Sequence, residues 1–473
     1  MGYESEATTV ALSGVIAEAD HARTARYADD AGRVLAAAPK SQRQAGHHLR
    51  ELVKALLLAA NPLFAAGNTT KNFNLRQYRL GRWLVAIVAL FGSAMPAMAE
   101  PGVTDSEIVI GMFAPLSGPL VTYGLDPVQT AQMLYEQVNQ KGGIHGRKIR
   151  VVVEDDKCQA TALVAAVKKL ATVDNVFILH GGSCTAAVTA AQEFITREKI
   201  PLVMLVAAGD PGVFPPTRYM FGSFGGTQRL YAAALTEFAA RQLKSKRLAI
   251  IVHDDEYGNA SLATAKAVAA RYGIEVVAVE RVPLNINDLT APMLNIRAAK
   301  PDAILSGAYP APAVLVAQKY AEYGMTATPL LEMTQGIPTA SVFAKNVGNE
   351  AALRNFYYSW AQNDVGDEAL RQKWTSMYKS RYPDREPGGF MIIGVPSTVA
   401  IIAALERAGP NLTRERFVDA METLEVKHEV MAGPIKFAPG RRDAIRDVNV
   451  VKFDGKTQTV MPGIYSWNGM DGN

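Results

Sequence analysis

Short apolar runs alternate along the chain with longer segments in which apolar residues recur every three to four positions. This pattern predicts strands alternating with amphipathic helices, because side chains repeat every two residues in a strand and every 3.6 residues in a helix. The first group of predicted elements is strand 108–113, helix 128–140, strand 149–154, helix 161–171, strand 177–180, helix 186–198 and strand 202–206. Such a series favours a parallel sheet covered by helices on both faces.

A segment rich in glycine and proline, residues 209–226, interrupts the alternation and cannot form a regular element. A second series follows it: helix 228–242, strand 248–252, helix 259–271, strand 275–279, helix 289–299, strand 303–306 and helix 311–323. The C-terminal third adds helices over 368–381, 392–407 and 414–424 and strands over 435–437 and 448–453. We expect these last elements to complete the two sheets already begun. The predicted fold is therefore α/β, with two doubly wound Rossmann-like lobes.

Residues 75–99 have the pattern of an export signal. Three arginines precede the apolar run 83–94, namely Arg76, Arg79 and Arg82. The run ends at Pro96 and the small-x-small sequence Ala97-Met98-Ala99, which signal peptidase recognises. About a dozen apolar residues are too few to span ~30 Å of hydrocarbon as a helix. We expect a signal peptide cleaved near Ala99, with an uncleaved membrane anchor as the alternative.

Residues 1–74 precede this predicted signal peptide, although signal peptides stand at the N-terminus of a protein. The segment is rich in alanine and contains no recognisable motif. We interpret it as an over-extended start or a disordered extension. A translated cytoplasmic segment ahead of an uncleaved anchor is the alternative.

Composition restricts the function classes. The chain has 473 residues, of which 49% are hydrophobic and 20% charged, as expected for a folded protein of two or more domains. A net charge of +4 without a long basic run disfavours nucleic-acid binding. Only two cysteines are present, which excludes a four-cysteine zinc site. In an exported protein Cys158 and Cys184 predict one structural disulfide, which closes a loop of about 27 residues.

The loops after the strands are the candidate sites, because ligands bind beyond the carboxyl ends of parallel strands. The loop from His180 to Thr185 is the strongest candidate, since its small residues let backbone N–H groups and hydroxyls approach an anion. A tight turn with a capping Ser or Thr is the structural alternative. A catalytic triad around Ser183 is disfavoured, because the chain has no Gly-x-Ser-x-Gly motif. The acidic run 254–256 could bind a metal but is more typical of a solvated loop.

Four motifs connect this chain with a known family. They are Gly-Met-Phe-Ala-Pro-Leu-Ser-Gly-Pro at 111–119, Tyr123-Gly124, Asn-Gln-Lys-Gly-Gly-Ile-His-Gly at 139–146 and Glu-Asp-Asp at 154–156. They resemble the branched-chain amino-acid class of periplasmic binding proteins, the substrate-binding components of ABC importers. The resemblance extends from residue 107 to about residue 466.

The resemblance implies a periplasmic, monomeric protein that has no catalytic activity, cofactor or metal and delivers a small molecule to an ABC permease. Three crossovers would form the hinge between the lobes, which close on the ligand. Lobe 1 would comprise residues 100–225 and 362–442, and lobe 2 residues 226–361 and 443–466. A sensor of the same fold is the alternative, and a hydrolase is a further one.

Site residues follow from the same resemblance. Cys158 and Cys184 match the disulfide of leucine-type members. Thr185 takes the hydroxyl position that meets the ligand carboxylate, and the backbone of Ala207 and Ala208 reaches the same group. The remaining matches are aromatic residues that line the cleft: Tyr123, Tyr257, Tyr309 and Phe390.

The sequence departs from the family pattern at two positions. Gly209 stands where a threonine hydroxyl usually meets the carboxylate, and Gln335 stands where an acidic residue pairs with the ligand ammonium. Glu332 lies close to Gln335 in the sequence and could supply that charge instead. An unpaired buried ammonium costs several kcal/mol. We therefore expect a carboxylate or amide without an α-ammonium, such as an aromatic acid, with branched-chain amino acids as the alternative.

Overall fold

The computed structural model describes residues 100–118, 120–207, 212–222, 224–283, 285–333 and 340–467. The predictions for residues 1–74 and for the signal peptide over 75–99 lie outside these residues. The same is true of Ala208, Gly209 and Gln335.

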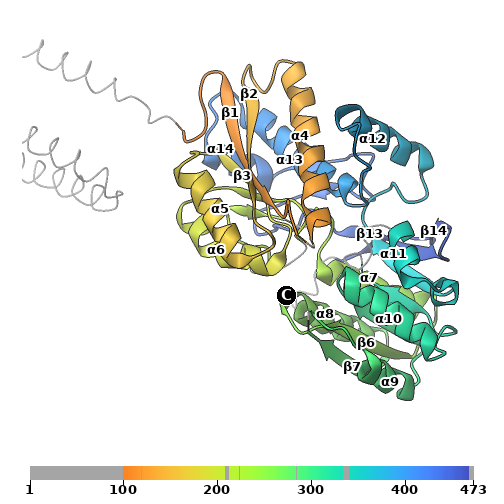
Figure 1. Ribbon diagram of the computed structural model, residues 1–473. Coiled ribbons are helices and arrows are strands. Elements are labelled where there is room, and N and C mark those ends of the chain that lie inside the picture. Colours follow the sequence, from red (N-terminus) through yellow and green to blue (C-terminus); the bar gives the residue numbers. More distant parts are fainter. Residues whose placement is uncertain are drawn as a thin grey trace, which may run out of the picture. The chain divides into compact units, whose positions relative to one another are not determined.

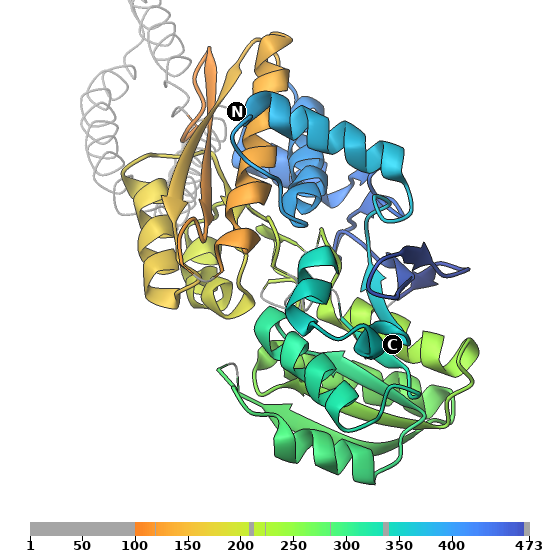
Figure 2. The ribbon, with the colours of Figure 1, turned by 45° about the vertical axis from the view of Figure 1, so that its right-hand side comes forward.

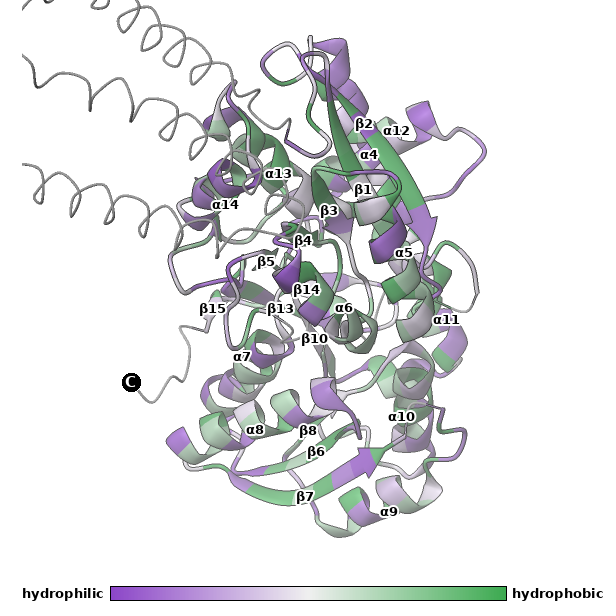
Figure 3. Cartoon of the chain, turned by 90° about the vertical axis from the view of Figure 1, so that its left-hand side faces the viewer, coloured by the Kyte–Doolittle hydropathy of each residue, from purple (hydrophilic) through white to green (hydrophobic). Residues whose placement is uncertain are grey.

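The first sheet consists of five parallel strands in the order β2-β1-β3-β4-β5. The strands are β1 (Glu107–Ala114), β2 (Lys148–Asp155), β3 (Ile178–Gly181), β4 (Leu202–Met204) and β5 (Met220–Phe221). In β1, Ile108 and Ile110 are buried on one face and Val109 and Phe113 on the other, so the sheet is covered on both sides. Figure 3 shows hydrophobic residues along β1 accordingly.

Helices from distant parts of the chain cover this sheet (Figure 1). Helices α5 (Ala160–Thr172) and α6 (Thr185–Arg197) lie on one face, where Leu163 and Val188 join the core. Helices α4 (Leu125–Gln140) and α13 (Gly394–Ala408) lie on the other face and contact each other. Figure 2 shows the C-terminal helices, in blue, beside α4, in orange.

The second sheet combines two directions. Strands β7-β6-β8-β9-β10 are parallel, and β13, β14 and β15 add to the β10 side in antiparallel pairing. The strands are β6 (Arg247–His253), β7 (Glu275–Val282), β8 (Ala303–Gly307), β9 (Leu330–Glu332), β10 (Phe356–Trp360), β13 (Asp447–Phe453), β14 (Gln458–Val460) and β15 (Tyr465–Ser466). The predicted pair of Rossmann-like lobes is confirmed.

Helices cover both faces of the second sheet as well. Tyr357 of β10 packs on Phe238 of α7 (Gln228–Arg241), and its neighbour Phe356 packs on Phe343 of α11 (Ala340–Val347). Adjacent strand residues point to opposite faces, so these two helices lie on opposite sides. The other helices of this lobe are α8 (Glu256–Arg271), α9 (Thr290–Ala298) and α10 (Pro310–Glu322).

The C-terminal third only partly follows the prediction. Helices α12 (Glu368–Arg381), α13 and α14 (Arg414–Glu422) form as expected, and β13 extends the second sheet. The expectation that strand 435–437 joins a main sheet is wrong. It forms β12 (Ile435–Lys436), which pairs with β11 (Glu425–Val426) as a separate two-stranded sheet. Only Ile435 of β12 is buried while Lys436 is exposed, a pattern that suits a short surface ribbon.

The chain passes between the sheets three times: after β5, after β10 and before β13. The first and third passages are hydrogen-bonded to each other at Gly222. Its N–H donates to Arg442 O at 3.0 Å, and its C=O accepts from Ala444 N at 2.9 Å. Asp443 is buried between these bonds and accepts from Arg446 Nε at 2.7 Å.

One segment among the described residues, Met391–Ala408, is long and apolar enough to cross a membrane. Two-thirds of it is buried inside the protein, and it contains all of α13. The buried face includes Val395, Ile401 and Leu405, so the segment is accounted for as a core helix.

His180 on β3 is the polar centre of this core. It is fully buried, with Nδ1 3.0 Å from Tyr135 Oη on α4 and Nε2 2.9 Å from Ser397 Oγ on α13. Burial lowers the pKa of His180 to about 3 because the imidazolium would lose its hydration. The neutral ring therefore joins the sheet to both helices on this face.

This ring makes stability depend on pH. In the unfolded chain His180 titrates near its ordinary pKa of 6.5, so the unfolded state binds a proton that the native state does not bind as the pH falls. The contribution of His180 to the free energy of unfolding is present above pH 6.5. It decreases by about 2 kcal/mol between pH 7 and pH 5. Urea unfolding at both pH values should show a smaller pH dependence for His180→Gln than for wild type. Parallel curves of stability against pH for wild type and His180→Gln would contradict this prediction.

Candidate functional site

The loop between β3 and α6 brings two predicted site residues to one edge of the first sheet. Gly182 has φ +87°, and a Cβ there would lie 2.7 Å from Val188 Cγ2, so only glycine fits. The Gly182 C=O accepts from the N–H groups of Val206 and Ala207 at 3.2 and 3.1 Å. The loop that precedes Thr185 is thereby bonded to the loop that contains Ala207.

Thr185 is the first residue of α6, and its side chain is largely buried. The first N–H groups of a helix have no intrahelical partner and carry partial positive charge, so this end of α6 suits an anion. Ser183, two residues earlier, is also buried, and its Oγ has no hydrogen-bond partner among the described residues. Sequence reasoning identified this loop but did not include Ser183 among the ligand contacts.

The predicted disulfide between Cys158 and Cys184 is present, with Cα atoms 5.5 Å apart. Cys184 is the N-cap residue of α6, and no side-chain hydrogen bond caps that helix. The disulfide ties this position to the loop after β2. There the Cys158 N–H donates to Asp156 Oδ1 at 2.8 Å. The covalent link therefore holds the N-terminus of α6 next to the end of β2.

Tyr123 and Phe390 form an aromatic pair in lobe 1. Their ring centroids are 4.7 Å apart, and both side chains are almost completely buried. Tyr123 ends a short 3₁₀ turn before α4, whereas Phe390 precedes the 3₁₀ turn that leads into α13. Two segments far apart in the sequence thus supply one apolar surface.

In lobe 2 His253 fixes the position of Tyr309. The Tyr309 N–H donates to His253 Nε2 at 2.9 Å, and the two rings stack with centroids 4.7 Å apart. Because Nε2 accepts, the proton is on Nδ1, which lies 3.3 Å from Val282 O. Burial lowers the pKa of His253, which favours this neutral form. His253 was not among the predicted site residues, although its place at the end of β6 was a signal for it.

Tyr257 and Glu332 complete the lobe 2 group. Tyr257 lies in the first turn of α8, with its ring 5.4 Å from that of Tyr309. Glu332 ends β9 and is completely buried, with Oε1 accepting from Ala308 N at 3.3 Å. Neither Tyr257 Oη nor Glu332 Oε2 has a hydrogen-bond partner in the described part of the chain. Burial raises the pKa of the Glu332 carboxyl well above its ordinary value.

The two lobes bring these groups into electrostatic range of each other. The pKa of Tyr123 is raised by burial first and then by the charges of Tyr309 and Glu332. The pKa of Tyr257 is raised by burial and by the same two residues, among others. The four predicted aromatic residues therefore lie near one another, beside the buried Glu332 carboxyl and several hydroxyls. Such a region can bind a small molecule that has an apolar body and acceptor oxygens.

The catalytic and metal alternatives find no support in the described residues. His180 is held by Tyr135 and Ser397, so it is engaged elsewhere and does not act on Ser183. Asp255 caps α8 by accepting from Gly258 N at 2.8 Å, and Asp254 pairs with Arg281 at 2.8 Å. No group of three or more histidine, cysteine, aspartate or glutamate side chains suited to a metal occurs in the described ranges.

Comparison with known proteins agrees with this fold. The profile of the family described as "Periplasmic binding protein" matches residues 107–458. A curated relative, Leu/Ile/Val-binding protein homolog 7 of Brucella abortus, is 23% identical over 388 residues, which are 80% of this chain and 96% of the relative.

Two solved structures have the same fold. An ABC transporter substrate-binding protein from Sphaerobacter thermophilus has a TM-score of 0.68 at 18% identity, covering 76% of this chain and 98% of its own. A solute-binding protein of an ABC transporter from Rhodopseudomonas palustris BisB5, in complex with 3,4-dihydroxybenzoic acid, has a TM-score of 0.65 at 21% identity. That match covers 77% of this chain and 98% of the other.

The disulfide should contribute strongly to stability. Replacing both cysteines with serine releases a loop with a sequence separation of 26 residues. The chain-entropy argument gives a loss of about 3.5 kcal/mol. Urea unfolding of the double variant against wild type measures this loss, and thiol titration of the unreduced native protein should find no free thiol. Two titratable thiols in that protein would refute the disulfide.

His253 should be required to hold Tyr309 in place. His253→Ala removes the acceptor of the Tyr309 N–H and the stacked ring, so it should cost about 2–4 kcal/mol of unfolding free energy. His253→Gln restores an acceptor near the position of Nε2 and should cost less. Lys266→Ala, at an exposed position of α8, should change stability by less than about 0.5 kcal/mol. Equal losses for His253→Ala and Lys266→Ala would contradict the role of His253.

Proposed function

The chain belongs to the periplasmic binding protein family, and from that premise we propose that it captures a small carboxylate or amide without an α-ammonium group. The family consists of substrate-binding proteins rather than enzymes, and ABC members deliver their ligands to permeases in the membrane. An aromatic acid is the ligand class that we favour, with branched-chain amino acids as the second candidate. A sensor role for the same cleft is the alternative to import.

The buried carboxyl of Glu332 carries this proposal. It has no exposed surface, its Oε1 accepts from Ala308 N at 3.3 Å, and burial raises its pKa. Burial therefore favours the protonated carboxyl, which has a hydrogen to donate. A protonated carboxyl can donate a hydrogen bond to a ligand oxygen. To pair with a ligand ammonium, Glu332 would first have to lose that proton.

The other polar groups of the region favour the same ligand chemistry. Ser183 Oγ and Tyr257 Oη are buried without a partner among the described residues, and both can donate to an oxygen. The N-terminus of α6 at Thr185 adds backbone donors and partial positive charge. Tyr123 and Phe390 supply an apolar surface for the ligand body. A buried donor left unpaired costs about 1–3 kcal/mol, so the ligand would relieve this cost.

Lobe closure belongs to the same proposal. We place the lobe boundaries at residues 225/226, 361/362 and 442/443, where the chain passes between the two sheets. One contact already links the lobes outside the buried region, from Thr189 Oγ1 on α6 to Glu256 Oε2 on α8 at 3.4 Å. Membership of the family implies the periplasm. Export by cleavage after Ala99 and a monomeric state remain part of the proposal.

A panel of ligands combined with Glu332→Gln should separate the two ligand classes. Benzoate and 4-hydroxybenzoate should raise the melting temperature more than leucine, isoleucine or valine, because a ligand at 100 times its Kd adds about 2.7 kcal/mol to the native state. Glutamine keeps a donor and an acceptor, so the variant should bind these acids within about threefold of wild type. Thermal shift identifies the binders, and calorimetry gives each Kd.

An amino-acid ligand would give the opposite result. Its ammonium would need the ionised Glu332 carboxylate, and Glu332→Gln would then weaken leucine binding by about 100-fold or more. Glu275→Gln, which changes an exposed carboxylate at the start of β7, the edge of the sheet opposite the site, serves as the control and should leave every Kd unchanged within about twofold. A leucine response that is abolished by Glu332→Gln would therefore overturn the proposal.

A further inference from the structure

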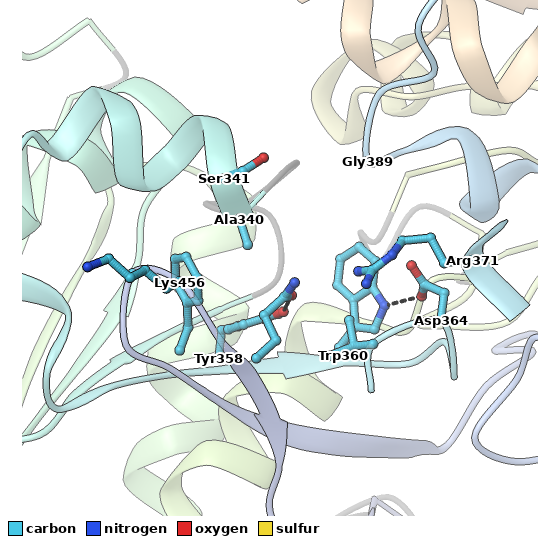
Figure 4. A pocket seen from close by; sticks show the side chains of 12 residues that line it. Ala340, Ser341, Tyr358, Trp360, Asp364, Arg371, Gly389 and Lys456 are labelled. Atoms are coloured by element: carbon cyan, nitrogen blue, oxygen red, sulfur yellow. Dashed lines mark hydrogen bonds between the residues drawn. The ribbon is translucent and has the colours of Figure 1, made fainter. Parts of the chain in front are cut away.

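A cavity of about 410 Å³ lies beside the aromatic region and is not part of the predicted site. Its walls come from α11, β10, the β13–β14 turn, α12 and the segment before α13. Figure 4 shows its lining side chains. Those used below are Tyr358, Trp360, Asp364, Arg371, Gly389 and Gln458.

One wall of the cavity is aromatic. Tyr358 and Trp360 are two residues apart on β10, so both side chains are on the same face of the sheet, with ring centroids 6.2 Å apart. The Tyr358 hydroxyl donates to Gln458 Oε1. Gln458 therefore has its amide nitrogen as the remaining donor. The wall combines flat apolar surface with a hydrogen-bond donor.

The charged groups that line the cavity are Asp364, Arg371 and Lys456. Trp360 Nε1 donates to Asp364 Oδ1 at 2.8 Å, and burial raises the pKa of that carboxyl. Arg371 on α12 reaches into the cavity near this pair, whereas the Lys456 ammonium points away from Arg371 (Figure 4) and pairs with Glu350 at 3.0 Å. Arg371 also pairs with Glu368 on its own helix. A guanidinium has five N–H donors, so others remain for a second anion.

The cavity adjoins the predicted ligand site through one short segment. Gly389 lines the cavity, and the next residue, Phe390, stacks on Tyr123 in the aromatic region. A second, smaller cavity of about 140 Å³ shares Asp364, Arg371 and Gly389 with the first. The two cavities therefore adjoin each other along this segment.

From this arrangement we infer that the cavity is a subsite for the far end of an elongated ligand, whose distal carboxylate binds Arg371. This inference rests on the proposed function, because the near end of the ligand is the carboxylate or amide held in the aromatic region. The body between the two ends would lie along Trp360 and Tyr358. The ligand class is thus an aromatic dicarboxylate or a similar two-ended acid.

A homologous series of acids tests the subsite. Wild-type protein is titrated by calorimetry with benzoate, terephthalate and 3-(4-carboxyphenyl)propanoate, which differ in the reach of the second carboxylate. At least one dicarboxylate should bind tenfold or more tightly than benzoate. Arg371→Met should remove that gain and leave the Kd of benzoate within about twofold, since a charge-assisted hydrogen bond contributes about 1.5–3 kcal/mol.

Lys379→Met is the matched control, because Lys379 lies on the same helix and pairs with Glu386 outside the cavity. It should leave the whole series unchanged, and the melting temperature of each variant without ligand shows that the fold is intact. Equal affinities of benzoate and both dicarboxylates in wild type would overturn the subsite while leaving the proposed function intact. An equal loss for benzoate and the dicarboxylates in Arg371→Met would also overturn it. Failure of all three acids to bind would instead overturn the proposed ligand class.

Discussion

Strand direction is the constraint on which the rest of this structure depends. All five strands of the first sheet are parallel, and β6 to β10 of the second are parallel as well. Strand ends and the N-termini of the following helices therefore gather at one edge of each sheet. Thr185 begins α6, Tyr257 stands in the first turn of α8, Tyr309 precedes α10 and Glu332 ends β9. The donors and aromatic rings of the site converge because their backbones share this direction.

Much of this arrangement is predictable from the sequence. Hydrophobic periodicity identified the alternation of strands and helices, and the loops that hold Tyr257 and Tyr309 follow from it. Short elements escaped the prediction. Strand β9 has only three residues, and β10 follows a segment without clear periodicity. A run of that length contains too few positions to distinguish the period of a strand from that of a helix.

The chemistry of the site was harder to predict, because it depends on burial and on partners distant in sequence. The sequence offered Glu332 only as an alternative to Gln335. The burial of Glu332 and the absence of a partner for its Oε2 among the described residues come from its place on β9, between β8 and β10. The tautomer of His253 depends on the Tyr309 N–H, 56 positions later. The cavity at Arg371 has walls from five separate segments. No local sequence pattern predicts contacts between segments so far apart in the chain. The fold was predictable because the family motifs are short, local runs of residues.

The bond between His180 and Ser397 has a consequence for how the chain folds during synthesis. The two residues are 217 positions apart, and most of lobe 2 lies between them. A chain that emerges N-terminus first presents β3 long before α13 exists to cover it. The part of the first sheet that α13 covers therefore stays open to solvent while the strands of lobe 2 are being made. The N-terminal lobe begins first and is completed only after the inserted lobe, and its uncovered apolar surface can aggregate in that interval.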